Sequence, residues 1–189
     1  MHQNRYTGLA IALHWLVAVL MLGNIVLAWG FDWVPETQIR LAIDTHKSIG
    51  ITVLGLAVLR ILWRLGHRPP AWPQGALTAT ESRAAHVVHG LLYVLMVALP
   101  LSGWLHDSAW TAAESHPLTL FGLVEVPRLG WVMAQAPEFK ERLHDLFGEA
   151  HELLAVGLYV LFAMHVAGAL KHQWLDKQPT LERMFWRRR

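Results

Sequence analysis

The sequence predicts an all-α integral membrane protein, a bundle of four transmembrane helices, and three observations support this fold class. The chain of 189 residues is 54% apolar and only 16% charged, whereas a soluble domain has about a quarter charged residues. Four apolar runs are long enough to cross a hydrocarbon core of about 30 Å. Tryptophans gather near the ends of these runs, as they do in the aromatic belts of membrane proteins.

The predicted spans organise the chain as a single domain over residues 1–189. Each span contains polar residues, which in a membrane helix usually face the interior of the bundle. One long connection, 107–147, separates the last two spans and contains an amphipathic piece at 137–146. The spans cover about residues 7–31, 44–65, 84–106 and 148–172.

Basic residues are distributed unevenly between the two sides of the predicted bundle. Eleven of the sixteen lysines and arginines precede the first span, lie in the 60–83 connection or follow the fourth span. The connections on the other side, about 32–47 and 107–149, contain five basic and ten acidic residues. By the positive-inside rule, both termini are expected to be cytoplasmic and the 107–147 connection to lie outside.

The residue types present restrict the possible redox and metal chemistry. The chain has no cysteine, which excludes disulfides, iron–sulfur clusters, thiolate zinc sites and covalent haem attachment through C-x-x-C-H. Twelve histidines remain as candidate metal ligands.

Four of these histidines form two pairs matched in depth. His14 lies about seven residues from the inner start of the first span, and His165 about seven residues from the inner end of the fourth. His46 and His151 both lie near the outer side. His151 and His165 share one helix face, about 21 Å apart along the axis. Because a b haem binds between two facing imidazoles, the pattern predicts two b haems in the bundle core.

The inner pair has an alternative composition. His89 lies deep enough in the third span to replace His165 or His14 as an inner ligand. A lone histidine in a membrane helix is also often a hydrogen-bonded polar residue with no metal. His86, nearer the interface, could bind a haem propionate or a quinone.

Several charged or titratable residues have both a functional and a simpler interpretation. Arg60 could pair with a haem propionate or merely follow the positive-inside rule. His172 could donate to a quinone or be an interfacial residue. Lys47, beside His46, could attract a small anion to the outer site, although the acid-rich outer connections oppose this at long range. The other histidines are expected to be solvated, at helix ends or in loops: 2, 67, 106, 116 and 144.

Several segments together resemble the bacterial cytochrome b561 family. They are His14-Trp15, HKSIG at 46–50, LRILWR at 59–64, HGLLYVLMVALPLSGW at 89–104, LFGLVEVP at 120–127 and KHQWLDKQPTLERM at 171–184. The same plan is similar to that of the membrane cytochrome b subunits of nickel–iron hydrogenases and formate dehydrogenases.

The resemblance implies an inner bacterial membrane protein with two non-covalent b haems. Their ligands would be His14 with His165 and His46 with His151. It also implies electron exchange with ubiquinone, and for free-standing members the oxidation of superoxide at the periplasmic face.

Three functional hypotheses follow from these observations. The first is a superoxide:ubiquinone oxidoreductase in which Lys47 and His172 act at the two ends. The second is a cytochrome b subunit that passes electrons between a periplasmic dehydrogenase or cytochrome and the quinone pool, with 107–147 as its docking surface. The third, a haem-free metal transporter, is disfavoured because the spans almost lack the mid-membrane acids that would relay an ion. Membrane lipid is an expected contact, and a nucleic-acid partner is not.

Overall fold

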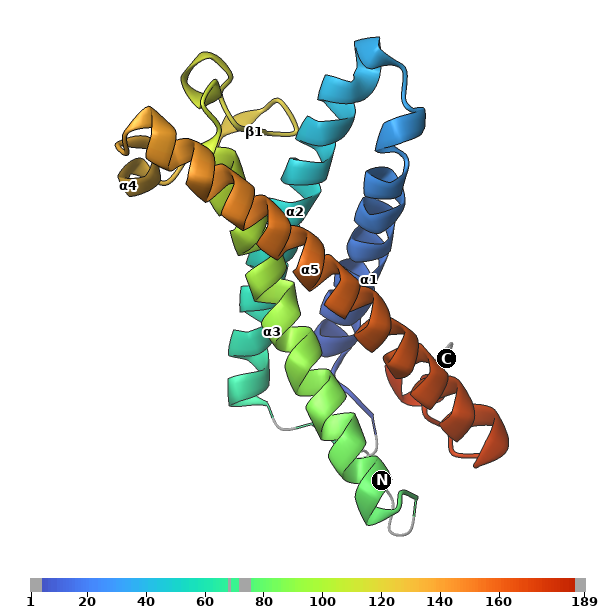
Figure 1. Cartoon of the computed structure of the whole chain (residues 1–189). Helices are drawn as coiled ribbons and strands as arrows, with labels where there is room; N and C mark the ends of the chain where they lie inside the picture. The colour runs from blue at the N-terminus through green and yellow to red at the C-terminus, as the bar shows by residue number, and fades with distance from the viewer. Residues whose placement is uncertain (1–4, 68, 72–75, 186–189) are drawn as a thin grey trace.

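The computed structural model describes residues 5–67, 69–71 and 76–185. Arg68, His2 and the arginines at 187–189, which contribute to the expectations above, lie outside these described residues. Within them, four helices are long and apolar enough to cross a membrane. The structure thus confirms a mostly helical chain with four helices that are able to span a membrane. The helices are α1 Gly8–Trp29, α2 Glu36–Gly66, α3 Ala79–Ala109 and α5 Pro137–Leu170 (Figure 1).

Local sequence signals determine where these helices begin. The Thr7 hydroxyl caps α1 by accepting from the Ala10 amide at 3.3 Å. At the start of α3, Thr78 and Glu81 form a capping box, in which each side chain accepts from the other residue's backbone amide. Pro137 occupies the first turn of α5, where the missing N–H has no helical partner to lose.

The fourth long helix extends well beyond its predicted span. Residues 137–147, the end of the predicted 107–147 connection, form the first turns of α5. After Pro137 this segment contains no proline or glycine up to Phe147 to stop a helix. The 34 residues of α5 give it a length of about 51 Å, more than a hydrocarbon core requires.

The outer connection between α3 and α5 is an ordered cap. It contains the antiparallel strands β1 Thr119–Leu120 and β2 Val124–Glu125 and the short helix α4 Gly130–Met133 (Figure 1). Phe121 and Gly122 join the strands with φ values of 52° and 71°, the left-handed pair that a tight hairpin requires.

Two buried serines fasten this cap to the helices beneath it. Ser48 of α2 accepts from the Phe121 amide at 2.9 Å, and Ser108 of α3 accepts from the Leu129 amide at 3.1 Å. The cap therefore holds a fixed position over the outer ends of α2 and α3.

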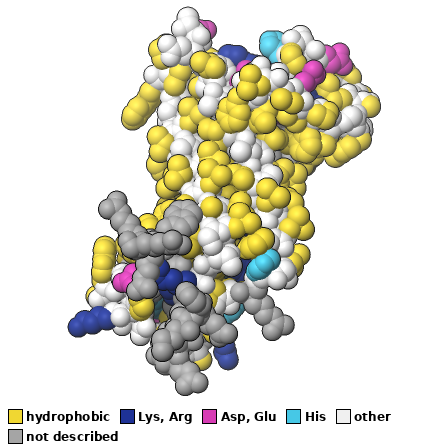
Figure 2. All heavy atoms as spheres, turned by 180° about the vertical axis from the view of Figure 1, so that it is seen from behind, with side chains coloured by type: hydrophobic (Ala, Val, Ile, Leu, Met, Phe, Trp, Pro, Cys, Tyr) yellow, Lys and Arg dark blue, Asp and Glu magenta, His cyan; other side chains and the backbone are white. Residues whose placement is uncertain are grey.

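The helices pack around a small apolar core. Helix α3 packs along α5, and α2 packs on both α1 and α3. Val17, Val53, Ala57 and Met96 form the buried centre. Many other apolar side chains are exposed, and in Figure 2 apolar side chains cover the middle of the molecule while charged side chains lie toward its two ends. This distribution is typical of a protein that is surrounded by lipid.

At the inner end, the segment after α5 folds back beneath α1. The Trp15 indole N–H donates to the Met184 carbonyl at 2.7 Å. The Arg183 guanidinium donates to the carbonyls of Pro70 and Ala71 at 2.8 and 3.0 Å. The C-terminal segment therefore joins α1 to the connection between α2 and α3.

Candidate functional site

The outer candidate site is a pair of histidines that face each other across two helices. The imidazoles of His46 on α2 and His151 on α5 have centroids 6.2 Å apart and planes at 72°. The Nδ1 atom of His46 is buried and has no hydrogen-bond partner in the described part of the chain.

The inner candidate site repeats this geometry at the opposite end of the bundle. His14 on α1 and His165 on α5 have ring centroids 6.2 Å apart and planes at 68°. Here too the Nδ1 of the α1 partner, His14, is buried without a hydrogen-bond partner among the described residues. Helix α5 thus contributes one histidine to each site.

Both separations fit a metal ion held between two imidazoles. Two metal–nitrogen bonds of about 2 Å, with half a ring behind each nitrogen, place the ring centroids about 6 Å apart. A direct hydrogen bond of about 3 Å between ring nitrogens would bring the centroids to about 5 Å. The four residues therefore fit the bis-histidine ligation of two b haems.

A third histidine lies beside the inner pair. The ring of His89 on α3 is 5.1 Å from that of His165 by centroids. This is shorter than the separation within either pair. His89 is therefore close enough to compete for the inner site, as the sequence indicates.

Arg60 lies next to the inner pair without a carboxylate partner among the described residues. Its guanidinium lies over the ring of Tyr93 at 5.1 Å, and Arg64 lies over the same ring at 5.5 Å. Arg60 is half-buried, and a cation in a membrane span usually pairs with an opposite charge. A haem propionate would be such a partner.

Lys47 adjoins His46, but its charge is compensated. Its Nζ lies 2.5 Å from Asp107 Oδ1, and the same carboxylate accepts from Arg128 Nε at 2.8 Å. The Asp107 side chain is only 4% exposed. The ammonium thus helps to join α2 to α3 and, through Asp107 and Arg128, to the outer cap.

His172 lies in a π-helical turn, Lys171–Leu175, that continues from α5. Its Nδ1–H donates to Asp176 at 2.7 Å, and Lys171 pairs with Asp176 at 2.7 Å and with Glu81 at 2.6 Å. Hydrogen bonds from Lys171 and His172 hold the pKa of the Asp176 carboxyl below its usual range. The Lys171 ammonium bridges the two carboxylates, which disfavours a metal ion there.

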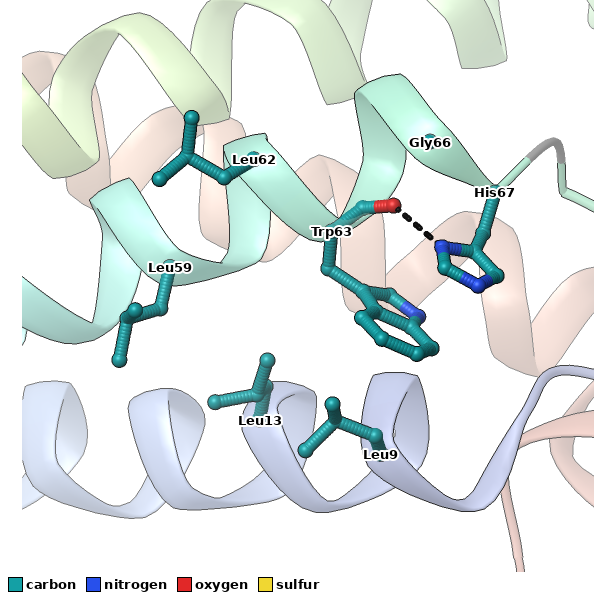
Figure 3. A pocket seen from close by; sticks show the side chains of 7 residues that line it. All are labelled: Leu9, Leu13, Leu59, Leu62, Trp63, Gly66 and His67. Carbon is teal, nitrogen blue, oxygen red and sulfur yellow. Dashed lines mark hydrogen bonds between the residues drawn. The ribbon is translucent and has the colours of Figure 1, made fainter.

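An apolar groove lies apart from these sites. It has a volume of about 370 Å³ and lies between α1 and α2 (Figure 3). At one end the His67 ring stacks on Trp63 with centroids 3.6 Å apart. Its lining includes no paired histidine: Leu9, Leu13, Leu59, Leu62, Trp63, Gly66 and His67.

Comparison with known proteins agrees with the geometry. A family model described as prokaryotic cytochrome b561 matches residues 5–187. The chain belongs to this family. It is therefore a membrane redox protein, and the family implies b-type haem. The resemblance seen in the sequence segments is confirmed.

Three relatives align with almost the whole of this chain. Cytochrome b561 homolog 2 of Escherichia coli K12 is 34% identical over 95% of the chain and 90% of its own length. A probable superoxide oxidase CybB of Yersinia pestis is 31% identical over 100% of the chain and 99% of its own length. Cytochrome b562 of Cereibacter sphaeroides is 26% identical over 95% of the chain and 94% of its own length.

Several residues at the sites are not singled out as functional by the sequence. Ser102 and Gly103 of α3 contact His151, and Asp107 and Arg128 form the ion-pair cluster with Lys47. Ser102 carries a usable signal, since polar residues in a span tend to face the bundle interior, whereas Asp107 follows the predicted span, 84–106, directly. Gly103 and Arg128 carry none, because their contacts arise only from packing.

Two further histidines differ from expectation. His106 and His144, expected to be solvated, stack with ring centroids 3.8 Å apart. Each Nδ1 donates to the other residue's backbone carbonyl, at 2.8 and 3.0 Å. They join the outer ends of α3 and α5. The physical reason is that α5 begins before residue 144 and so packs there on α3.

Proposed function

We propose that this cytochrome b561 family member moves electrons across the bacterial inner membrane through two b haems. His46 and His151 would hold the outer one, and His14 and His165 the inner one. The observation that carries the proposal is the repeated geometry, a 6.2 Å ring separation at both ends of the bundle. Bound b haem supplies reversible one-electron chemistry.

Helix α5 acts as the common scaffold of the two sites. Its two ligands lie about 21 Å apart along the axis, so each end of the bundle has its own redox site. Arg60 would neutralise a propionate at the inner site, where a low dielectric makes an unpaired charge costly.

We place the inner site, with both chain termini, on the cytoplasmic side. Described basic residues support this orientation by the positive-inside rule: Arg5, Arg60, Arg64, Arg83, Lys171, Lys177 and Arg183. The outer cap would then lie in the periplasm.

Superoxide and ubiquinone are the proposed substrates at the two ends. The name of the Yersinia pestis relative supports superoxide. Each superoxide would lose one electron and leave as dioxygen, and ubiquinone would gain two electrons and two protons to become ubiquinol. His172, held by Asp176 at 2.7 Å in the π-helical turn, is the proposed proton donor near the inner site, because such turns are frequent at functional sites. His86, on the same side, stays an alternative.

The experiment that tests the proposal first is a reduced-minus-oxidised spectrum of the purified chain with its haem-to-protein ratio. Two low-spin b haems per chain are expected, and superoxide should reduce them without a partner protein. A chain that contains no haem would contradict the proposal.

Single histidine variants test the ligand assignment. His151→Ala and His165→Ala should each lose one haem and keep the other, because each removes a ligand of one site only. The outer variant should lose reduction by superoxide. If His165→Ala kept two haems while His89→Ala lost one, His89 would be the inner ligand.

A second function, as a membrane subunit for a periplasmic dehydrogenase or cytochrome, is favoured by the outer cap. The hairpin presents exposed apolar side chains, Phe121 at 52% and Leu123 at 85%, and Lys47 is held in an ion pair with Asp107. Such a surface suits a protein better than a small anion. Reduction only by a co-purifying protein, and not by superoxide, would select this alternative.

A further inference from the structure

We infer that Ser102 and Gly103 of α3 are positioning residues for His151. Together they would hold its imidazole in the one neutral tautomer, and the one orientation, in which Nε2 can bind a metal. The inference rests on the proposed function, since it concerns a ligand of the outer haem.

The hydrogen bonds of His151 determine its tautomer. Its Nδ1 lies 3.1 Å from the Leu99 carbonyl oxygen and 3.0 Å from Ser102 Oγ. A carbonyl oxygen only accepts, so Nδ1 must carry the hydrogen, and in a neutral ring Nε2 then has the free lone pair.

Ser102 strengthens this arrangement. Its hydroxyl donates to the same Leu99 carbonyl at 2.8 Å, so its hydrogen is engaged and its lone pairs are available to Nδ1–H. The ring N–H of His151 is thereby shared between two acceptors. Ser102 is itself buried, at 6% exposed, so water does not replace it readily.

Gly103 provides the space that the ring occupies. A Cβ at this position would lie 3.1 Å from His151 Cε1 and 3.3 Å from its Nδ1. These distances are below ordinary van der Waals contact, so any other residue would push the imidazole away from α3. The two neighbouring residues thus act on one ring, Ser102 by a hydrogen bond and Gly103 by close approach.

The partner of His151 differs in this respect. The Nδ1 of His46 has no hydrogen-bond partner in the described residues. A hydrogen-bond acceptor on the Nδ1–H makes an imidazole that binds a metal through Nε2 more basic. A more basic ligand favours the oxidised metal and lowers its reduction potential.

The experiment compares four variants of the full-length purified protein with the wild type: Ser102→Ala, Ser102→Thr, Gly103→Ala and Gly157→Ala. Haem content, redox titration and the electron paramagnetic resonance spectrum of the ferric state are measured for each. Ser102→Ala should keep two haems and raise the potential of one, with a change in that haem's resonance signal. Ser102→Thr keeps the hydroxyl and should restore the wild-type values.

Gly103→Ala should lose or displace one haem. Gly157→Ala is the matched control at the same α3–α5 interface, since its Cβ would meet Leu95 at an ordinary 3.8 Å, and it should keep both haems unchanged. Two haems in the wild type with no shift in Ser102→Ala, or an unaltered spectrum in Gly103→Ala, would overturn the positioning role and leave the proposed function standing. A wild type without two haems would overturn both.

Discussion

Asp107 accepts hydrogen bonds from two cations, Lys47 and Arg128, where α2, α3 and the outer cap meet. Removing one member of a buried ionic cluster leaves uncompensated charge and typically costs about 3–5 kcal/mol. Asp107→Asn should therefore lower the thermal unfolding midpoint markedly, as followed by tryptophan fluorescence in detergent.

Asp44→Asn is the control for this variant. Asp44 pairs with Arg40 at 2.9 Å, but both side chains are near 40% exposed, and such surface pairs contribute about 0–1 kcal/mol. Equal losses of stability in the two variants would show that the Asp107 cluster is not a determinant of the outer end.

The same cluster leads to a prediction for Lys47 as a guide for superoxide. Because the Lys47 ammonium is held in an ion pair with the buried Asp107 carboxylate, Lys47→Gln should change the rate of superoxide-driven reduction by no more than about two-fold at low salt. Stopped-flow measurement at two ionic strengths checks this. A tenfold fall that disappears in high salt would show that Lys47 does steer the anion.

At the scale of the element, the π-helical turn after α5 places Lys171, His172 and Asp176 together. The pKa of the Asp176 carboxyl is held below its usual range. The carboxylate is therefore ionised at neutral pH, and it loses its charge only in stronger acid than an ordinary carboxylate does. Asp176→Asn should therefore lower ubiquinone reduction throughout the range from about pH 5 to 8. Haem content should be unchanged.

Steady-state assays across that pH range, with the haem-to-protein ratio as control, provide the test. A variant with the wild-type rate across the whole range would contradict the proposed partnership of Asp176 with His172.

The helices also show how far sequence reasoning extends. Hydropathy identifies four spans, because a membrane requires long apolar helices whatever their neighbours are. It does not place the start of α5 at Pro137, since the polar turns up to Phe147 lie outside the apolar run. Nor does it predict the π-helical turn at Lys171–Leu175, because hydropathy does not register a local change in the backbone hydrogen-bond pattern.

At the scale of the whole molecule, depth along the membrane normal brings distant residues together. His14 and His165 are far apart in sequence, yet counting from the helix ends is enough to pair them, and their rings face each other in the structure. The contacts of Ser102, Gly103 and Asp107 cannot be obtained in this way. They depend on helix rotation and on the fold of the outer cap, which depth alone does not determine.

The orientation of the whole molecule can be tested directly because the chain has no cysteine. Leu123 in the outer hairpin and Leu175 at the inner end are 85% and 76% exposed, so a single cysteine at either position is accessible and disturbs little packing. In intact spheroplasts, a membrane-impermeant maleimide should label Leu123→Cys and should reach Leu175→Cys only after permeabilisation. The cysteine-free protein is the blank. The reverse labelling pattern would place the termini outside, against the positive-inside rule, and would transfer the proposed superoxide site to the pair formed by His14 and His165.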